Sequence, residues 1–216
     1  MSQIKFVMLD FDGTIADSVE SVIYCAEKIF HNEGVPFDKT IVEENMGCTT
    51  RGCIALLIGR DDPELVDRLT EAYNTIYKNE GLDMIRLFDG VLETIQHLHS
   101  KGIKIAITSN NIVSAISYVA ERLGLMPYLE CIVGVECVEH GKPEPDIAIE
   151  AMRRAGVTAE ESLVVGDSTY DMGMGRNAGC HCCGVSYGCD TPQTLTESGA
   201  EWIIGSFSEL EQIVLG

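Results

Sequence analysis

Residues 6–14 read Phe-Val-Met-Leu-Asp-Phe-Asp-Gly-Thr, an apolar run that leads directly into two aspartates and a glycine. A continuous apolar run of this length suits a strand buried on both faces, and hence a parallel sheet covered by helices. Asp10 and Asp12 are two residues apart in extended chain, so their side chains point to the same side. Asp-Gly is also a common surface turn, but the apolar strand before it disfavours that interpretation.

Apolar runs and helical stretches alternate along most of the chain. This alternation predicts an open α/β fold built on a parallel sheet. Ligands bind such sheets at the carboxyl ends of the strands, where Asp10 and Asp12 are expected. The expected strands are 6–9, 103–107, 131–135, 163–165, 181–185 and 202–204, and the expected helices between them are 90–100, 113–123 and 146–155.

Residues 19–82 differ from the rest because they contain no comparable apolar strand. They are predicted to be nearly continuous helix, with breaks near 34–36, 47–49 and 59–63, where glycine and proline gather. A helical insertion after the first strand explains this pattern. We therefore expect an α/β core domain made of residues 1–16 and 83–216, and a small all-helical cap domain at residues 17–82.

The charge balance restricts the binding partners. The chain has 34 acidic and 15 basic residues, for a formal charge of -19, which argues against nucleic acids and anionic membranes as partners. An anionic substrate would need local positive charge from a metal ion and a few basic side chains. No apolar run approaches the roughly 20 residues that cross a bilayer, and residues 1–5 do not resemble a signal peptide, so a cytoplasmic location is expected.

Nine cysteines are an odd number for a disulfide scaffold, so reduced and mostly buried thiols are expected. Cys180, Cys182, Cys183 and Cys189 lie close together with His181, which raises the alternative of a zinc site. Their spacing is poor for a tetrahedral site and they coincide with an expected strand. Strand-buried thiols are therefore the favoured interpretation.

Polar groups follow three further strands. Ser109 and Asn110 supply hydroxyl and amide donors, although this segment is equally a good turn or helix cap. Lys142 precedes a Pro-x-Pro segment and a helix start, and Asp167 and Asp171 follow another apolar run. Carboxylate oxygens without a histidine or cysteine cluster are the ligands that Mg²⁺ selects. The sequence thus predicts a magnesium site.

Together these segments resemble the haloacid dehalogenase-like superfamily of phosphohydrolases, over nearly the whole chain. The resemblance rests on Gly-Lys-Pro-x-Pro-Asp at 141–146, Val-Gly-Asp-Ser-x-x-Asp at 165–171 and Asn-Ala-Gly at 177–179, besides residues 10–14. The helical insertion is similar to the cap of the phosphoglycolate phosphatase and β-phosphoglucomutase-like subgroup. The resemblance implies a Rossmann-like core and a phosphoric monoester hydrolase.

The resemblance also implies the roles of individual residues. Asp10 would attack phosphorus and become an aspartyl phosphate, and Asp12 would protonate the leaving oxygen and then activate water. Lys142 would neutralise the phosphoryl group and Asp10. The metal ligands would be Asp10, Asp12 through its main-chain carbonyl, Asp167 and Asp171, and the phosphate contacts would be Gly13, Thr14, Ser109, Asn110 and Lys142.

Arg51 is a candidate cap residue for substrate binding, because it lies by the loop at 47–52 that is expected to face the core. An arginine there would suit a carboxylate or second phosphate, although a solvated surface arginine is an equal alternative. Phosphoglycolate is the first substrate candidate by resemblance. The expected partner is a small phosphorylated metabolite, and the protein is expected to be a monomer or a small homo-oligomer.

The superfamily also contains enzymes with other activities, and the sequence disfavours three of them. Dehalogenases of the superfamily lack the second aspartate, which is present here as Asp12. The β-phosphoglucomutase-like mutases carry a histidine where this chain has Val22. A phosphonatase would need a Schiff-base lysine from the cap; Lys28 and Lys39 are present, but the surrounding pattern of that family is not evident.

Pyrophosphatase or nucleotidase activity uses the same core and stays open. A phospho-receiver signalling domain is disfavoured because receivers are shorter and lack the Asp-x-Asp-Gly-Thr pattern. Asn111 departs from the family, whose members often carry a basic residue there, so substrate contacts near it are expected to differ.

Overall fold

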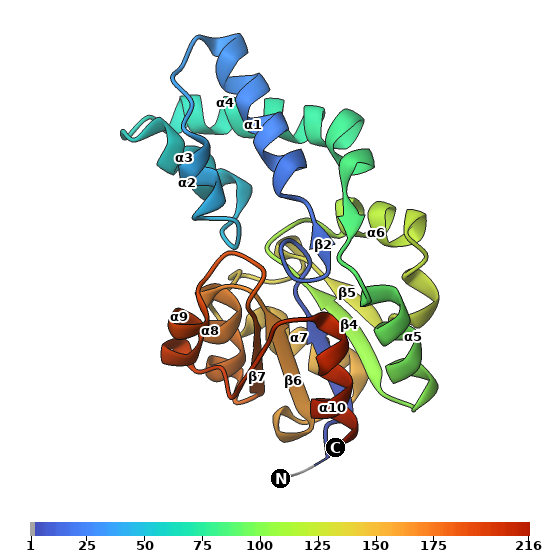
Figure 1. The fold of residues 1–216 in the computed structure, drawn as a ribbon. Helices are drawn as coiled ribbons and strands as arrows, with labels where there is room; N and C mark the ends of the chain where they lie inside the picture. The colour runs from blue at the N-terminus through green and yellow to red at the C-terminus, as the bar shows by residue number, and fades with distance from the viewer. Residues whose placement is uncertain (1–2) are drawn as a thin grey trace.

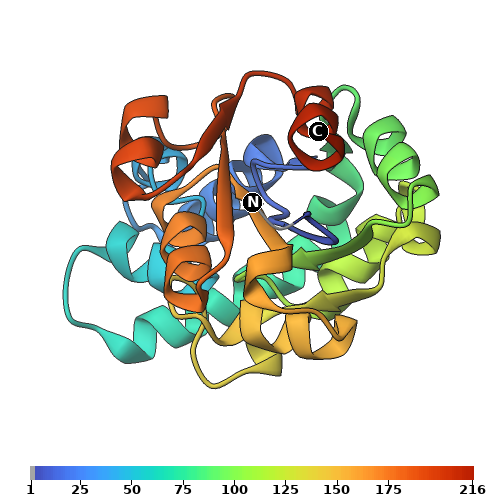
Figure 2. The same ribbon diagram turned by 90° about the horizontal axis from the view of Figure 1, so that it is seen from below.

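A computed structural model describes residues 3–216 and contains a six-stranded sheet with helices on both faces (Figures 1 and 2). The strand order is β5-β4-β1-β6-β7-β8, and every neighbouring pair is parallel. The predicted parallel α/β fold is confirmed. The strands are β1 (Phe6–Leu9), β4 (Lys104–Thr108), β5 (Cys131–Val133), β6 (Ser162–Gly166), β7 (His181–Val185) and β8 (Trp202–Ile204).

Both faces of the sheet are buried, as the apolar runs predicted. In β1, Val7 and Leu9 belong to one core cluster, and Phe6 and Met8 belong to the other, because successive side chains point to opposite faces. The first cluster includes residues of α5 (Val91–Ser100), α6 (Val113–Arg122) and α10 (Leu210–Leu215). The second includes residues of α7 (Asp146–Ala155), α8 (Thr169–Ala178) and α9 (Pro192–Ser198).

Four helices project beyond the sheet at the carboxyl end of β1 (Figure 1). The chain turns between them within or beside the predicted breaks, and α1 ends at Gly34 with a left-handed φ of 64°. Glycine adopts this conformation without the steric cost of a side chain. The helices are α1 (Val19–Glu33), α2 (Lys39–Glu43), α3 (Thr50–Ile58) and α4 (Pro63–Ile76), which continues into a π-helical turn at Tyr77–Gly81.

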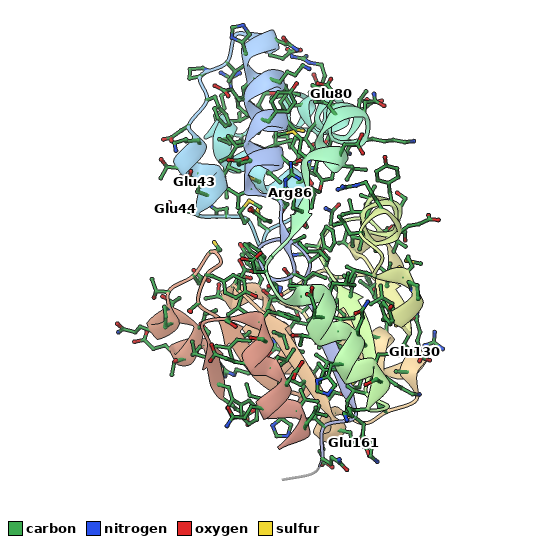
Figure 3. The ribbon with its side chains drawn as sticks, turned by 45° about the vertical axis from the view of Figure 1, so that its right-hand side comes forward. Glu43, Glu44, Glu80, Arg86, Glu130 and Glu161 are labelled. Atoms are coloured by element: carbon green, nitrogen blue, oxygen red, sulfur yellow. The ribbon has the colours of Figure 1, made fainter. Side chains whose placement is uncertain are left out.

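A two-stranded ribbon connects these helices to the sheet. It consists of β2 (Ala16–Asp17) and β3 (Arg86–Leu87), which pair antiparallel. Figure 3 shows Arg86 on this connection, between the helical part and the sheet part. The ribbon lies at or near both expected domain boundaries, and the division into core and cap stays a prediction.

The remaining elements are single 3-10 turns in the connections. They are Leu82–Met84, Met126–Tyr128, Val135–Cys137, Ala159–Glu161 and Phe207–Glu209. Within the described part of the chain, no helix has the length and apolar character needed to cross a membrane.

All nine cysteines are free, as expected, but only four are buried and the other five are partly buried, so the expectation of mostly buried thiols is met in part. Cys180, Cys182 and Cys183 are buried in or beside β7, while Cys189 is partly buried in a loop. Burial raises the pKa of the first three thiols to about 12. The burial of Cys180, Cys182 and Cys183 agrees with the favoured interpretation of strand-buried thiols.

Helix α8 lies very close to the sheet at Gly175, which yields a test of core packing. A Cβ atom there would lie 2.4 Å from Cys182 Sγ. We expect Gly175→Ala to lower the free energy of unfolding by about 1–3 kcal/mol in urea denaturation, despite the better helix propensity of alanine. Gly205→Ala is the control, because its nearest new neighbour is 3.6 Å away. Equal stabilities of the two variants would contradict the packing argument.

Candidate active site

The candidate site lies at the carboxyl ends of β1, β4 and β6, where neighbouring connections leave the sheet in opposite directions. Asp10 follows β1, and its N–H donates to Val165 O at 2.9 Å, which extends the pairing with β6. Ser109 follows β4 and Asp167 follows β6. The parallel sheet therefore brings side chains more than 50 residues apart in sequence to one edge.

A buried ionic cluster forms the centre of the site. Lys142 Nζ lies 2.5 Å from Asp10 Oδ1 and 2.5 Å from Asp171 Oδ1, and its side chain is 2% exposed. Burial alone would lower the pKa of Lys142, but the two carboxylates outweigh it and the pKa is raised. The lysine therefore stays charged. For Asp10, burial and the charge of Asp171 raise the pKa well above its ordinary value, and Lys142 opposes them.

Three carboxylates crowd around this lysine. Asp10, Asp167 and Asp171 each offer an oxygen atom, and the three atoms lie within 4.8 Å of one another. Burial, together with the charge of Asp171, raises the pKa of Asp167 to about 7. One lysine does not balance three buried carboxylates, so the cluster fits an additional cation.

Hydrogen bonds fix the orientation of two of these carboxylates. Asp167 accepts from the Cys189 N–H at 2.8 Å and from Thr14 Oγ1 at 3.3 Å. Asp171 Oδ2 accepts from Ser168 Oγ at 2.7 Å and from the Ser168 N–H at 3.2 Å. These contacts leave each carboxylate with a defined direction toward the centre of the site.

Gly13 forms a tight turn directly after the two aspartates. Its φ is 87°, and a Cβ atom there would lie 2.2 Å from Asp167 Oδ2. Both the backbone conformation and the close approach of Asp167 require glycine. The turn thereby lets the carboxyl ends of β1 and β6 approach each other.

Asp12 has a different environment from Asp10. Its Oδ2 accepts from Asn111 Nδ2 at 3.3 Å, and its Oδ1 is buried without a hydrogen bond of ordinary geometry, although the Ser18 hydroxyl lies near it. Burial raises the pKa of Asp12, against the opposing effects of Ser18 and Asn111. The side chain suits a carboxyl group that alternates between protonated and ionised forms.

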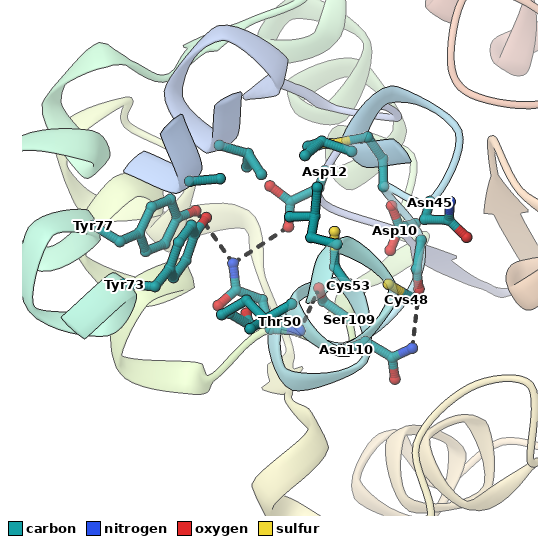
Figure 4. Close-up of a pocket in the computed structure, with 18 residues that line it drawn as sticks. Asp10, Asp12, Asn45, Cys48, Thr50, Cys53, Tyr73, Tyr77, Ser109 and Asn110 are labelled. Carbon is teal, nitrogen blue, oxygen red and sulfur yellow. Dashed lines mark hydrogen bonds between the residues drawn. The ribbon is translucent and has the colours of Figure 1, made fainter. Parts of the chain in front are cut away.

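A pocket lies between the helical part and the sheet part, and Asp10 and Asp12 are among the residues that line it (Figure 4). The pocket is partly open to solvent. The sheet part contributes Asp10, Asp12, Ser109, Asn110 and Asn111. The helical part contributes Val22, Ala26, Val42, Asn45, Met46, Gly47, Cys48, Thr50, Cys53, Ile54, Leu57, Tyr73 and Tyr77.

Direct contacts hold the helical part against the sheet part. Asn110 Nδ2 donates to Gly47 O at 3.0 Å, while Asn110 Oδ1 accepts from the Lys142 N–H at 2.9 Å. Asn111 Nδ2 also donates to Tyr77 Oη at 3.2 Å. The structure is thus a closed arrangement, and the prediction that the loop at 47–52 faces the core is confirmed.

Most residues predicted for the site converge on it. Thr14 is fully buried, and its hydroxyl donates a hydrogen bond to Asp167 instead of lining the pocket. Arg51 is exposed on α3, and its Nε donates to Asp67 Oδ1 at 2.8 Å. It lines a neighbouring pocket, together with Lys78, and not the pocket that contains Asp10. Its role in substrate binding stays a prediction.

Sequence reasoning missed the two tyrosines of the pocket. Tyr73 and Tyr77 stack with ring centroids 5.4 Å apart, and Figure 4 shows their hydroxyl groups directed to the same side. Their spacing of four residues on one helix face was a usable signal. The signal did not say whether that face meets the sheet part or solvent.

Comparisons with known proteins agree with this geometry. A family model described as haloacid dehalogenase-like hydrolase matches residues 7–185. A phosphoglycolate phosphatase from Vibrio parahaemolyticus is 28% identical, over 98% of this chain and 96% of its own. Pyrophosphatase PpaX from Anoxybacillus flavithermus is 25% identical, over 98% and 97%. A solved structure from Bacteroides fragilis, described as a haloacid dehalogenase-like hydrolase, superposes with a TM-score of 0.92 at 27% identity, covering 96% of this chain and all of that one.

Gly47 provides a test of closure. A Cβ atom there would lie 2.6 Å from Ser168 Oγ and 3.0 Å from a ring carbon of Tyr170. We expect Gly47→Ala to keep the helical part from seating and to lower kcat/KM by about 10-fold or more in a phosphatase assay, with little change in thermal unfolding. Gly205→Ala serves again as the control. Unchanged kcat/KM in Gly47→Ala would contradict the proposed seating.

Lys142 provides a test of the ionic cluster. We expect Lys142→Met, measured in EDTA, to lose about 3–5 kcal/mol of unfolding free energy near neutral pH, because buried carboxylates lose their counter-charge. Removing Lys142 lets the pKa of Asp10 rise further above its unfolded value, so the folded state binds more protons than the unfolded state. The loss should therefore shrink as the pH falls from 8 to 5. A loss that grows over this interval would contradict the assignment.

Proposed function

The chain belongs to the haloacid dehalogenase-like hydrolase family and is a phosphatase, and we propose that it hydrolyses small phosphate monoesters with Mg²⁺ through a phosphorylated Asp10. The observation that carries this proposal is the buried cluster of Asp10, Asp167, Asp171 and Lys142 beneath a pocket that is open to solvent. Uncatalysed hydrolysis of phosphate monoesters is very slow, and a covalent intermediate divides it into two easier displacements.

Asp10 is the proposed nucleophile. It lines the pocket, and Lys142 holds its Oδ1 by a charge-assisted hydrogen bond that fixes the carboxylate. The P–O bond to the leaving group breaks as the bond to Asp10 forms. Water then attacks phosphorus in the second step, which releases phosphate and restores the carboxylate.

Asp12 is the proposed acid and base. Its raised pKa favours the protonated form at the start, and its Oδ1 lacks a hydrogen bond of ordinary geometry. It would donate a proton to the leaving oxygen in the first displacement. As a carboxylate it would take a proton from the attacking water in the second.

Ser109, Asn110 and Lys142 are proposed to hold the phosphoryl group. The Ser109 hydroxyl accepts from the Asn111 N–H at 3.0 Å, which leaves its own proton for a phosphate oxygen. Asn110 keeps Lys142 in place through the hydrogen bond to its main chain. Gly13 and Thr14 are proposed to support these residues indirectly. Gly13 does so through its tight turn, and Thr14 through its hydrogen bond to Asp167.

The carboxylates fit a divalent metal ion. All are hard oxygen donors, and their mutual repulsion when buried is what a cation would relieve. Asp10, Asp167 and the Asp12 main-chain carbonyl would hold Mg²⁺, with Asp171 as a direct or water-mediated ligand. When bound, the ion would screen the nucleophile from the phosphate charge and stabilise the phosphoryl oxygens.

A mutase is the second candidate function, and the pocket argues against it. Val22 lines the pocket at the position where the mutases of the resemblance carry histidine, and no described lining residue is a histidine. The structure also gives no support to a phosphonatase, because the two lysines considered for a Schiff base, Lys28 and Lys39, pair with Glu80 and Glu43 at the surface.

Phosphoglycolate and pyrophosphate stay candidate substrates, because one relative is named a phosphoglycolate phosphatase and another a pyrophosphatase. A cytoplasmic location and a small oligomer or monomer complete the proposal.

Substitution of the nucleophile tests the proposal. We expect Asp10→Asn to lower Mg²⁺-dependent turnover of p-nitrophenyl phosphate by about 10³-fold or more, because the amide cannot form the acyl phosphate. EDTA should abolish turnover of the wild type. Asp61→Asn, an exposed position on the helical part, is the matched control. Full metal-dependent turnover by Asp10→Asn would refute the mechanism, and a single turnover by the wild type would favour a phospho-receiver.

A further inference from the structure

The wall of the pocket opposite the aspartates carries no charge. Every lining residue contributed by the helical part is apolar or neutral, and among the described lining residues the only charged side chains are Asp10 and Asp12. This lining thus presents no lysine, arginine or histidine to a leaving group, whereas Arg51 and Lys78 line the neighbouring pocket that adjoins it at Thr50, Tyr77, Asn110 and Asn111. Lys142, the cation of the buried cluster, lies on the phosphate side and is already bound by two carboxylates.

The lysines and arginines of the helical part lie outside this lining, and two of them, Arg51 and Lys78, line the neighbouring pocket. Five cations of the helical part form ion pairs on exposed surfaces with acidic partners. Figure 3 shows one such partner, Glu80, away from the sheet part, while Glu43 and Glu44 lie at the lower edge of the helical part. The ion pairs are Lys28–Glu80, Lys39–Glu43, Arg51–Asp67, Arg60–Asp62 and Arg68–Glu33.

The wall offers neutral hydrogen-bonding groups instead. Tyr73 is only 5% exposed, and its hydroxyl makes no hydrogen bond within the described residues, although its side chain lines the pocket (Figure 4). Tyr77 Oη accepts from Asn111 and retains its own proton. Burial raises the pKa of both phenols well above its ordinary value, so both act as neutral donors. Val42, Ile54 and Leu57 supply the apolar surface around them.

These surroundings decide which leaving group is favoured. A carboxylate or a second phosphate would be desolvated without a counter-charge and would face the carboxyl groups of Asp10 and Asp12. An uncharged group would bury its apolar part and use the tyrosine hydroxyls for its polar part. Sites of this kind discriminate strongly, because an unmatched charge loses its hydration and gains no partner.

We propose that the substrate is a phosphate monoester of an uncharged alcohol, with an apolar body and a hydroxyl, carbonyl or amide group that Tyr73 and Tyr77 bind. This inference rests on the proposed phosphatase function and names the class of substrate for the same site. It disfavours phosphoglycolate, whose leaving group carries a carboxylate, as the preferred substrate.

A matched pair of substrates tests the inference. Phosphoglycolate and phosphoglycolamide have nearly the same shape, but the first ends in a carboxylate and the second in a neutral amide. We expect kcat/KM to favour phosphoglycolamide by about 10-fold or more. Equal turnover, or a preference for phosphoglycolate, would overturn the inference. Hydrolysis of p-nitrophenyl phosphate that depends on Asp10 is measured alongside, and its absence would refute the phosphatase function itself.

Charge variants give a second, independent readout. Thr50 lines the pocket at the start of α3, so Thr50→Lys should move the ratio of the two kcat/KM values toward phosphoglycolate by about 10-fold. Leu56→Lys is the matched control, since Leu56 is 49% exposed on the same helix and outside the pocket lining. Equal shifts in both variants would contradict the inference.

Arg51→Ala tests one of the two cations that line the neighbouring pocket, and Lys78→Ala tests the other with the same expected outcome. Because Arg51 pairs with Asp67 and lines only the neighbouring pocket, the ratio of the two kcat/KM values should stay at its wild-type value. A selective loss of phosphoglycolate turnover in either variant would assign the carboxylate to that residue and overturn the inference.

Discussion

The buried lysine between two aspartates is the interaction on which the site depends. Lys142 reaches Asp10 at the end of β1 and Asp171 in the first turn of α8, so a single ammonium group joins segments from opposite parts of the chain. Buried ions of this kind are tolerated only when their charges and hydrogen bonds are matched. The matching here is incomplete, because three carboxylates face one lysine. This local excess of negative charge makes the site receptive to a cation, and the net charge of -19 on the whole chain acts in the same direction.

The fold could be predicted from the sequence to a large degree, because the strongest signals were local. Apolar runs such as Leu163–Val165 have few alternatives to a buried parallel strand, and the glycine and proline breaks in residues 19–82 separated the helices correctly. The convergence of Asp10, Ser109 and Asp167 followed from the rule that parallel strands place their carboxyl ends on one edge. Even the loop at 47–52 was expected to face the sheet, and Gly47 does so.

The pocket wall could not be predicted in the same way. Its members come from several helices, and the side of each helix that faces the sheet depends on tertiary packing rather than on the local pattern. Tyr73 and Tyr77 therefore read as ordinary amphipathic positions, while Arg51 drew attention because of its charge. A charged residue can be identified directly from the sequence. A pocket wall without charged residues can be identified only from the folded structure, because its members come from several helices.

The two-stranded ribbon of β2 and β3 has a consequence for how such a protein can evolve by recombination. Both passages of the chain between sheet and helices run through paired residues, Ala16 with Leu87 and Asp17 with Arg86. The chain thus enters and leaves the intervening helices through this one two-stranded connection, and Asp10 and Asp12 lie on the sheet side of it. Recombination at this connection would exchange all the helices that line the pocket and leave Asp10 and Asp12 in place. The part of the pocket wall made by the helices could thus be inherited separately from the carboxylates of the sheet.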